Sequence, residues 1–260
     1  LVGMCIDQGK IESVEQSASD FIAQWKGTPK AAITIRHLLT MTSGLEFRGL
    51  AVRGIAGDQL AINAAAPVAF SPGTRWAYST PMFHLLYHVV EKAAGEPFEA
   101  YAQKNLIGPL GMKDTTWVTN AGTGANGPVK NYYSAKCSAR DLARFGLFAE
   151  RGGRWRGKQL IGPAYLRAAT SPSQALNGAY GYLWWENAKP GRSAGGMGEG
   201  QGYRFPGSPH DVFAALGAGG QVVLIAPSLD LVVIRQGRRP GPTMLPRLLA
   251  SVCAAAGYKA

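Results

Sequence analysis

The sequence has no long apolar run, few cysteines and few acidic side chains, and each shortage excludes a class of protein. No stretch of about 18 apolar residues is present, which argues against a membrane-spanning helix. The three cysteines, Cys5, Cys137 and Cys253, are odd in number and widely spaced, so neither a disulfide scaffold nor a cysteine-based zinc site is expected. Acidic residues number 16 against 27 Lys and Arg, giving a net charge of +11. The basic residues are scattered, which favours a basic surface over a nucleic-acid site.

Motifs of serine catalysis give little support to the common hydrolase classes. The letters of the nucleophile elbow G-x-S-x-G occur once, at Gly191-Arg192-Ser193-Ala194-Gly195, but inside a glycine-rich segment and not between an apolar strand and a helix, so a Ser-His-Asp hydrolase is not supported. S-x-x-K, in which one helical turn stacks a lysine against the serine so that the amine can take its proton, does not occur. The length and the 46% hydrophobic content still predict a single globular domain over residues 1–260.

The order of predicted elements is helices first and strands afterwards. Stop and start signals predict helices over the following segments: 1–7 with Gly9 as its cap, a short piece at 19–25, one from Thr34 to 43–44, one from Pro81 to Ala94 stopped by Gly95, one from Pro97 to about 107, one beginning after Ser138, and a last one over 245–255. Three apolar β-type runs, 212–216, 222–225 and 231–234, predict an antiparallel meander. The glycine-rich segment 191–207 is predicted to be a long loop. The fold class that follows is α+β.

Histidines and glycines give no sign of a metal or cofactor. His84 and His88 have the spacing of two zinc ligands, but no third ligand is evident, and solvent-facing histidines are the better interpretation. His37, in an apolar helix, is expected to be structural and to bond a neighbouring backbone group. A G-x-G-x-x-G match at 122–127 lacks the flanking strand and helix of a dinucleotide site.

Tyr78 is the side chain with the most chemical interest. It follows the turn Ser71-Pro72-Gly73 in FSPGTRWAYST and comes directly before a predicted helix, which could hold it toward a cleft. To act as a base at neutral pH, a tyrosine needs its pKa lowered by about three units from about 10, which takes nearby cations. An ordinary core or rim tyrosine is the alternative.

The segment 217–221 (GAGGQ) also allows two interpretations. It is either a plain bulged turn or a place where backbone N–H groups donate to a ligand.

A series of segments in order along the whole chain resembles serine hydrolases of the class C β-lactamase and penicillin-binding type, and within them the 6-aminohexanoate-dimer hydrolases and related esterases. The segments are LVGMCIDQGKI, TIRHLLTMTSGL, FSPGTRWAYST, KNLIGPLGMKDT, CSARDLARFG, YGYLWW and GAGGQVVLIAP. The resemblance implies a β-lactamase/transpeptidase-like α+β fold, with an antiparallel sheet flanked by helices and a mostly helical lobe. It also implies that Tyr78 is a proton shuttle, that the backbone at Gly217 and Ala218 belongs to the oxyanion strand, and that Thr80 and Trp184 lie at the substrate. A structural aromatic is the alternative for Trp184.

The sequence departs from the family pattern at three places. The nucleophile helix is matched only from Leu1, so we expect the serine and lysine of S-x-x-K, and the first strands of the sheet, to lie upstream or on another chain. Thr80 stands where β-lactamases have asparagine, and Leu216-Gly217-Ala218 replaces Lys-Thr-Gly, so the cation that binds a drug carboxylate is missing.

These observations predict a serine amidase or esterase that acts on a small neutral substrate through an acyl-enzyme, without metal or cofactor. A D-amino-acid peptidase or weak β-lactamase is one alternative, and a catalytically inactive ligand-binding module is another. No nucleic-acid partner and no membrane span are expected. The compartment stays open, with an extracytoplasmic location being one that the resemblance allows.

Overall fold

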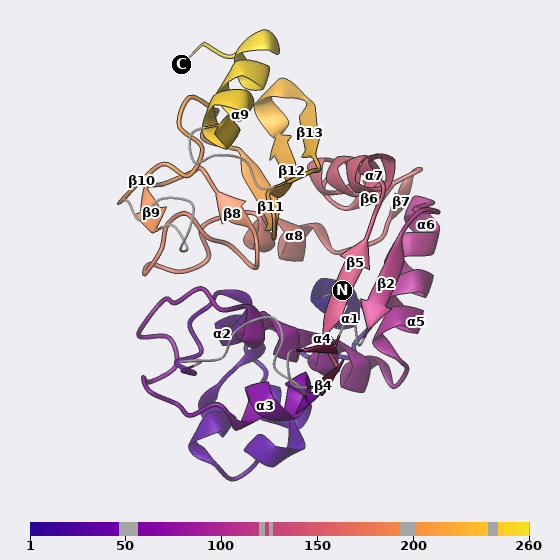
Figure 1. Ribbon diagram of the computed structural model, residues 1–260, viewed down its shortest axis with the longest axis vertical. Helices are drawn as coiled ribbons and strands as arrows, with labels where there is room; N and C mark the ends of the chain where they lie inside the picture. The colour runs from indigo at the N-terminus through magenta and orange to yellow at the C-terminus, as the bar shows by residue number, and fades with distance from the viewer. Residues whose placement is uncertain (47–56, 120–122, 125–126, 193–200, 239–243, 260) are drawn as a thin grey trace. The chain divides into compact units, whose positions relative to one another are not determined.

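The computed structural model describes residues 1–46, 57–119, 123–124, 127–192, 201–238 and 244–259. The chain divides into two compact units (Figure 1). Unit 1 comprises residues 1–109 and 113–137, and unit 2 comprises residues 110–112 and 138–260. The prediction of one domain over the whole chain is not tested by this division and stays a prediction.

Unit 1 is mostly helical, and local sequence signals explain its longest helix. Its α-helices are α1 Val2–Asp7, α2 Ile35–Leu39, α3 Gln59–Ala65, α4 Thr80–Ala94 and α5 Phe98–Ala102, followed by a π-helical turn over Gln103–Ile107 and by α6 Gly108–Leu110. Pro81 lies in the first turn of α4, and Gly95 ends it in the left-handed region at φ 70°. The buried face of α4 includes Leu85 and Val89, which are four positions apart and therefore lie on the same side of the helix.

Two helices of unit 1 are shorter than the sequence predicts. The segment expected to be helical over 19–25 forms two 3₁₀ turns, Ala18–Asp20 and Ala23–Trp25. The helix that begins after Thr34 was expected to reach residues 43–44, but α2 ends at Leu39. The side chain of Thr40 donates to the carbonyl of Arg36 at 2.8 Å, and Met41 then takes a left-handed φ of 61°, which an α-helix does not allow.

Short strands, none of them predicted, complete unit 1. They are β1 Gly57–Asp58, β2 Thr116–Thr119, β3 Thr123–Gly124, β4 Gly127–Lys130 and β5 Tyr133–Lys136. β2 and β5 pair antiparallel, while β4 pairs with β1 and β3. Such strands depend on partners far along the chain, which periodicity does not reveal.

Unit 2 contains a four-stranded antiparallel sheet in the order β13-β12-β11-β8. Its strands are β8 Trp185–Glu186, β11 Phe213–Gly217, β12 Gln221–Ala226 and β13 Leu231–Arg235. The three predicted β-type runs are thus confirmed, and β8 is an addition. The α+β class is confirmed as well.

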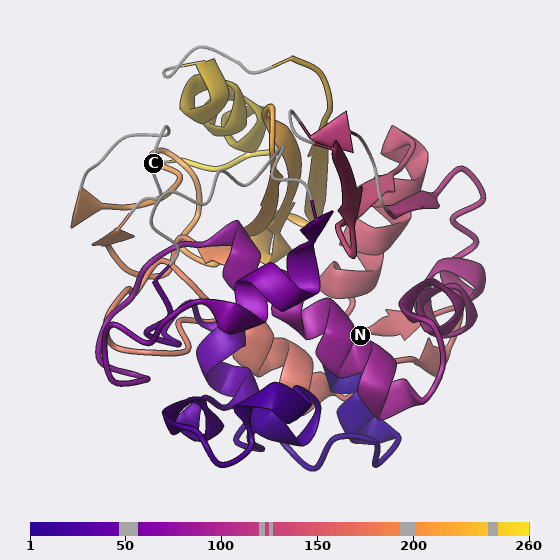
Figure 2. The same ribbon diagram turned by 60° about the horizontal axis from the view of Figure 1, so that its bottom comes forward.

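Helices of unit 2 pack against this sheet. α7 Ala139–Glu150 contacts β12 and β13, and Gly146 makes a close approach, because a Cβ there would collide with Val232 (Figure 1). Ser138 caps α7 by accepting from the N–H of Asp141 at 3.2 Å, as predicted. α9 Met244–Ala255 lies beside the sheet in both Figures 1 and 2. A further helix, α8 Pro163–Ala169, precedes β8.

The connections of unit 2 include two small hairpins. β6 Arg154–Trp155 pairs with β7 Lys158–Gln159, and β9 Gly191–Arg192 pairs with β10 Gln201–Gly202. The prediction of a loop over 191–207 is therefore wrong at Gly191–Arg192 and Gln201–Gly202, which form this strand pair. Residues 193–200 lie outside the described part of the chain.

Asn187 joins β8 to the segment 205–209. Its side-chain amide donates to the carbonyls of Phe205, Ser208 and Pro209 at 3.0–3.2 Å, and its oxygen accepts from the Phe205 N–H at 2.7 Å. Because Asn187 is 1% exposed, these bonds satisfy backbone groups that water does not reach.

Candidate active site

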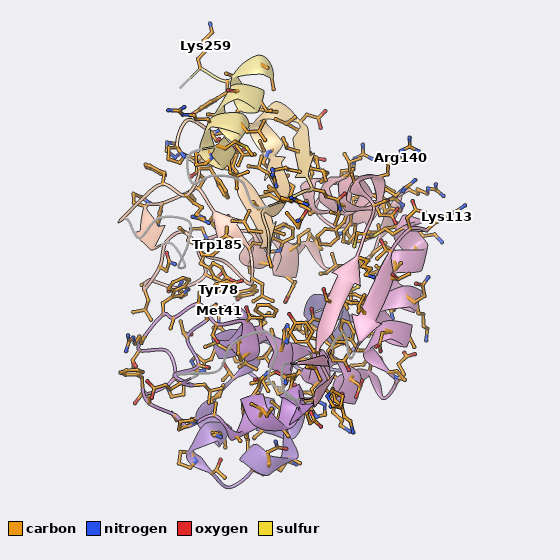
Figure 3. All side chains as sticks on the ribbon, in the orientation of Figure 1. Met41, Tyr78, Lys113, Arg140, Trp185 and Lys259 are labelled. Atoms are coloured by element: carbon orange, nitrogen blue, oxygen red, sulfur yellow. The ribbon has the colours of Figure 1, made fainter. Side chains whose placement is uncertain are left out.

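Tyr78 follows a turn in unit 1 that backbone hydrogen bonds hold in place. The N–H of Gly73 donates to the carbonyl of Thr42 at 2.8 Å, and the N–H of Ala77 donates to the carbonyl of Met41 at 3.0 Å. The turn is thereby tied to the segment after α2, and Tyr78 lies beside Met41 (Figure 3). Tyr78 is 37% exposed although the preceding Trp76 is buried. The Tyr78 residue is thus partly exposed on a backbone that these two hydrogen bonds hold in place.

The helix that follows Tyr78 begins at Thr80, with Ser79 as its N-cap residue. No side chain caps this N-terminus, and the buried hydroxyl of Ser79 has no hydrogen-bond partner within the described residues. A helix N-terminus carries a partial positive charge and unsatisfied N–H groups, which favour negative charge close by. The start of α4 therefore suits a neighbouring tyrosine that gives up its proton.

His37 packs against the turn at Gly73. The N–H of Thr34 donates to Nδ1 of His37 at 3.1 Å, so the predicted bond to a neighbouring backbone group is confirmed. A Cβ added to Gly73 would make a tight contact of 3.2 Å with Nε2 of this ring, and the left-handed φ of 82° at this position also favours glycine. Burial lowers the pKa of His37, a shift that favours the neutral ring, whose Nδ1 can accept this bond.

The interpretation of His84 as solvent-facing is wrong. His84 is 8% exposed, and its ring makes edge contacts with Phe83, Tyr87 and Tyr132 at centroid distances of 4.9, 5.4 and 4.7 Å. Burial lowers its pKa to about 4, so the ring stays neutral at physiological pH. Among the described residues no group of three His, Cys, Asp or Glu is arranged to hold a metal ion.

In unit 2, the turn after β11 directs one backbone N–H away from the sheet. The N–H of Gly220 donates to the carbonyl of Gly217 at 3.2 Å, so that carbonyl points toward β12. The peptide bonds are trans, and a trans peptide places the N–H of the next residue opposite the carbonyl. The N–H of Ala218 consequently points to the outer edge of β11.

The outer edge of β11 is open at this point. β8 pairs only with Phe213 and Ala214, and within the described residues no strand continues the pairing toward Gly217. Gly217 and Ala218 are both exposed. An unpaired strand edge of this kind can donate backbone hydrogen bonds to a ligand. Of the two residues named from the sequence, Ala218 rather than Gly217 offers its N–H there.

Trp184 is partly buried and packs within unit 2. Its ring stacks on Phe145 of α7 at 5.9 Å and meets Phe213 of β11 edge-on at 5.3 Å. These contacts place it beside the core formed by Ala149, Val223 and Ile225. Its role as a wall of a substrate cleft stays a prediction, as do the roles of Tyr78, Thr80, Gly217 and Ala218.

Comparison with known proteins decides the family. A sequence profile described as Beta-lactamase matches residues 1–251. The chain belongs to the beta-lactamase family. Esterase EstB of Burkholderia gladioli is 36% identical over 104 residues, which cover 34% of this chain and 26% of EstB. An uncharacterized protein of Alkalihalophilus pseudofirmus is 28% identical over 226 residues, which cover 78% of this chain and 59% of that protein.

Solved structures show the same fold. A Bacillus anthracis protein, provisionally described as a 6-aminohexanoate-dimer hydrolase, superposes with a TM-score of 0.71 and 18% identity, over 98% of this chain and 68% of that one. The predicted β-lactamase/transpeptidase-like α+β fold is thereby confirmed.

The chain spans between about a quarter and three fifths of the length of these curated relatives. In the described part of the chain no helix is both long and apolar enough to cross a membrane.

Proposed function

We propose that the protein containing this beta-lactamase-family chain is a serine hydrolase that cleaves small neutral amides or esters through an acyl-enzyme. The nucleophilic serine and its lysine would come from an S-x-x-K segment that the printed residues do not contain. The serine attacks the carbonyl carbon, the leaving group departs with a proton, and water then hydrolyses the acyl-serine. Esterase EstB, similar over about a third of the chain, supports this chemistry.

The observation that carries the proposal is the placement of Tyr78. An accessible phenol on a braced turn, next to an uncapped helix start, suits a group that shuttles protons between a nucleophile and a leaving group. A tyrosine of the hydrophobic core would instead be buried, as Tyr101 and Tyr180 are.

The outward N–H of Ala218 supplies the second part. A tetrahedral intermediate carries a negative oxygen, and backbone N–H groups stabilise it at little cost because they are already oriented. Ala218 lies at an exposed, unpaired strand edge, where such an oxygen can approach it.

The class of substrate follows from charges that are missing. Leu216, on β11, stands where the β-lactamase pattern has a lysine that binds the carboxylate of a penicillin, and Thr80 replaces an asparagine. A leucine gives no compensation for burying a carboxylate. Neutral esters and amides are therefore the proposed substrates.

A substrate panel tests this proposal on the full-length protein. We expect kcat/KM for p-nitrophenyl butyrate to exceed that for a chromogenic cephalosporin by about 100-fold or more, the scale of one missing charge-assisted bond. A preference for the cephalosporin would support the peptidase or weak β-lactamase alternative. Saturable binding of either compound without turnover would support the inactive ligand-binding module.

A further inference from the structure

Glu186 is a buried carboxyl group for which the proposed function has no use. It is 2% exposed, and its Oε1 is buried with no hydrogen-bond partner within the described residues. It lies on β8, where it is paired with Phe213 of β11, and its backbone N–H donates to the carbonyl of Ala179 at 2.9 Å. An ionised carboxylate in such a place would be strongly destabilising, because burial of an unpaired charge is costly.

Two backbone carbonyl oxygens and this carboxyl group border the same space beside Gly181. A Cβ added to Gly181 would collide with the carbonyl of Ala169, at the end of α8, and would lie 2.9 Å from both Ser171 O and Glu186 Oε1. The three oxygens thus face one small space. Each of the two carbonyls accepts one bond already, from the N–H of Tyr182 and from the hydroxyl of Ser173, and keeps a second lone pair.

The charged and titratable groups on the surrounding elements do not neutralise Glu186. Arg167 of α8 is exposed, and Arg144 of α7 pairs with Asp141 at 2.7 Å. Arg204 lies 4.5 Å over the ring of Trp185, whose side chain leaves the strand on the face opposite to that of Glu186. The phenols of Tyr165, Tyr180 and Tyr182 lie on α8 and on the loop before β8. Oε1 of Glu186 has no hydrogen-bond partner among the described residues.

We propose that Glu186 is a proton-dependent latch, in which the neutral carboxylic acid donates to the carbonyl of Ala169 or Ser171 and so ties β8 to the end of α8. When the proton leaves to solvent, the carboxylate faces carbonyl oxygens that repel it, and β8 is released. Since β8 is the strand that borders the outer edge of β11, the latch would control the strand next to the proposed oxyanion donor. Only this last consequence rests on the proposed function.

The direction of the pH dependence follows from the burial. Desolvation raises the pKa of Glu186 to about 9, whereas an unfolded glutamate has a pKa of about 4.3. Because the folded-state pKa is raised, the stabilisation is fully present below the unfolded pKa and is lost as the pH rises to the folded pKa. Between these two values the unfolding equilibrium constant rises about tenfold per pH unit, because folding binds one proton.

The test compares urea unfolding of the wild-type full-length protein with that of Glu186→Gln between pH 6 and pH 8.5. Glutamine keeps a donor for the same carbonyls and does not titrate. We expect the ratio of the two unfolding constants to change about tenfold per pH unit, and the control Glu12→Gln, at an exposed position, to show no such slope. A ratio that is independent of pH would overturn the proposal.

Infrared difference spectroscopy gives a second measurement that needs no stable variant. With ¹³C-labelled glutamate, the wild-type protein should show an isotope-shifted band of a protonated carboxylic acid at pH 7, and the band should disappear above about pH 10. Its absence at pH 7 would overturn the latch. Neither measurement requires hydrolysis, so an inactive protein would count against the proposed function and not against Glu186.

Discussion

Replacing Tyr78 with phenylalanine lowers kcat for ester hydrolysis by about 10²- to 10⁴-fold, the usual contribution of general acid–base catalysis. The phenyl ring keeps the packing beside Met41, whereas the hydroxyl that would move the proton is lost (Figure 3). If the phenol acts in the chemical step as proposed, kcat should fall much more than KM rises.

The measurement is steady-state hydrolysis by the full-length protein, together with the rate of acylation after rapid mixing. Tyr203→Phe is the matched control, since Tyr203 is likewise an exposed tyrosine, at 42%, and its ring packs on His210 within unit 2 at 4.5 Å. The control should retain wild-type kcat within about threefold. If Tyr78→Phe does the same, Tyr78 is an ordinary surface tyrosine.

Replacing Ala218 with proline removes the outward N–H and should lower kcat by about 10²- to 10³-fold, the loss typical of one oxyanion donor. Ala218 is not among the residues with positive φ, a region that a proline ring excludes, so the substitution avoids that conflict. The bond that shapes the turn joins Gly220 to Gly217 and does not use the N–H that is removed.

Ala218→Val provides the control because it enlarges the side chain and keeps the N–H. We expect it to stay within about fivefold of wild type in kcat, with both variants unfolding at wild-type urea concentrations within about 0.5 M. Equal losses in the two variants would mean that the side chain, not the backbone donor, matters at this position.

The parts of the fold that the sequence predicts are those set by local chemistry. Pro81 and Gly95 mark both ends of α4, Ser138 caps α7, and short apolar β-type runs identify β11 to β13. The sequence does not predict β8, because this strand has two residues and depends on its pairing with β11. The sequence does not predict the burial of His84 for a similar reason, since its aromatic partner Tyr132 lies 48 positions away in the chain.

In the candidate site, too, some features can be predicted from local sequence and others depend on the folded structure. Tyr78 is recognisable because a proline–glycine turn and a helix start flank it in the sequence. Which residue near Gly217 offers its N–H depends on one turn hydrogen bond, and only the structure reveals that it is Ala218. No sequence pattern indicates that Glu186 is buried without a partner, because that depends on how α8 ends and on the glycine at 181.

The central claim, that this beta-lactamase-family protein is a serine hydrolase, is tested most directly by intact-mass measurement of the full-length protein before and after exposure to a fluorophosphonate. The account predicts one adduct per molecule, mapped by fragmentation to the serine of an S-x-x-K segment outside the 260 residues, with labelling much slower in Tyr78→Phe. A protein that stays unlabelled, or one labelled at a serine within these residues, would contradict it.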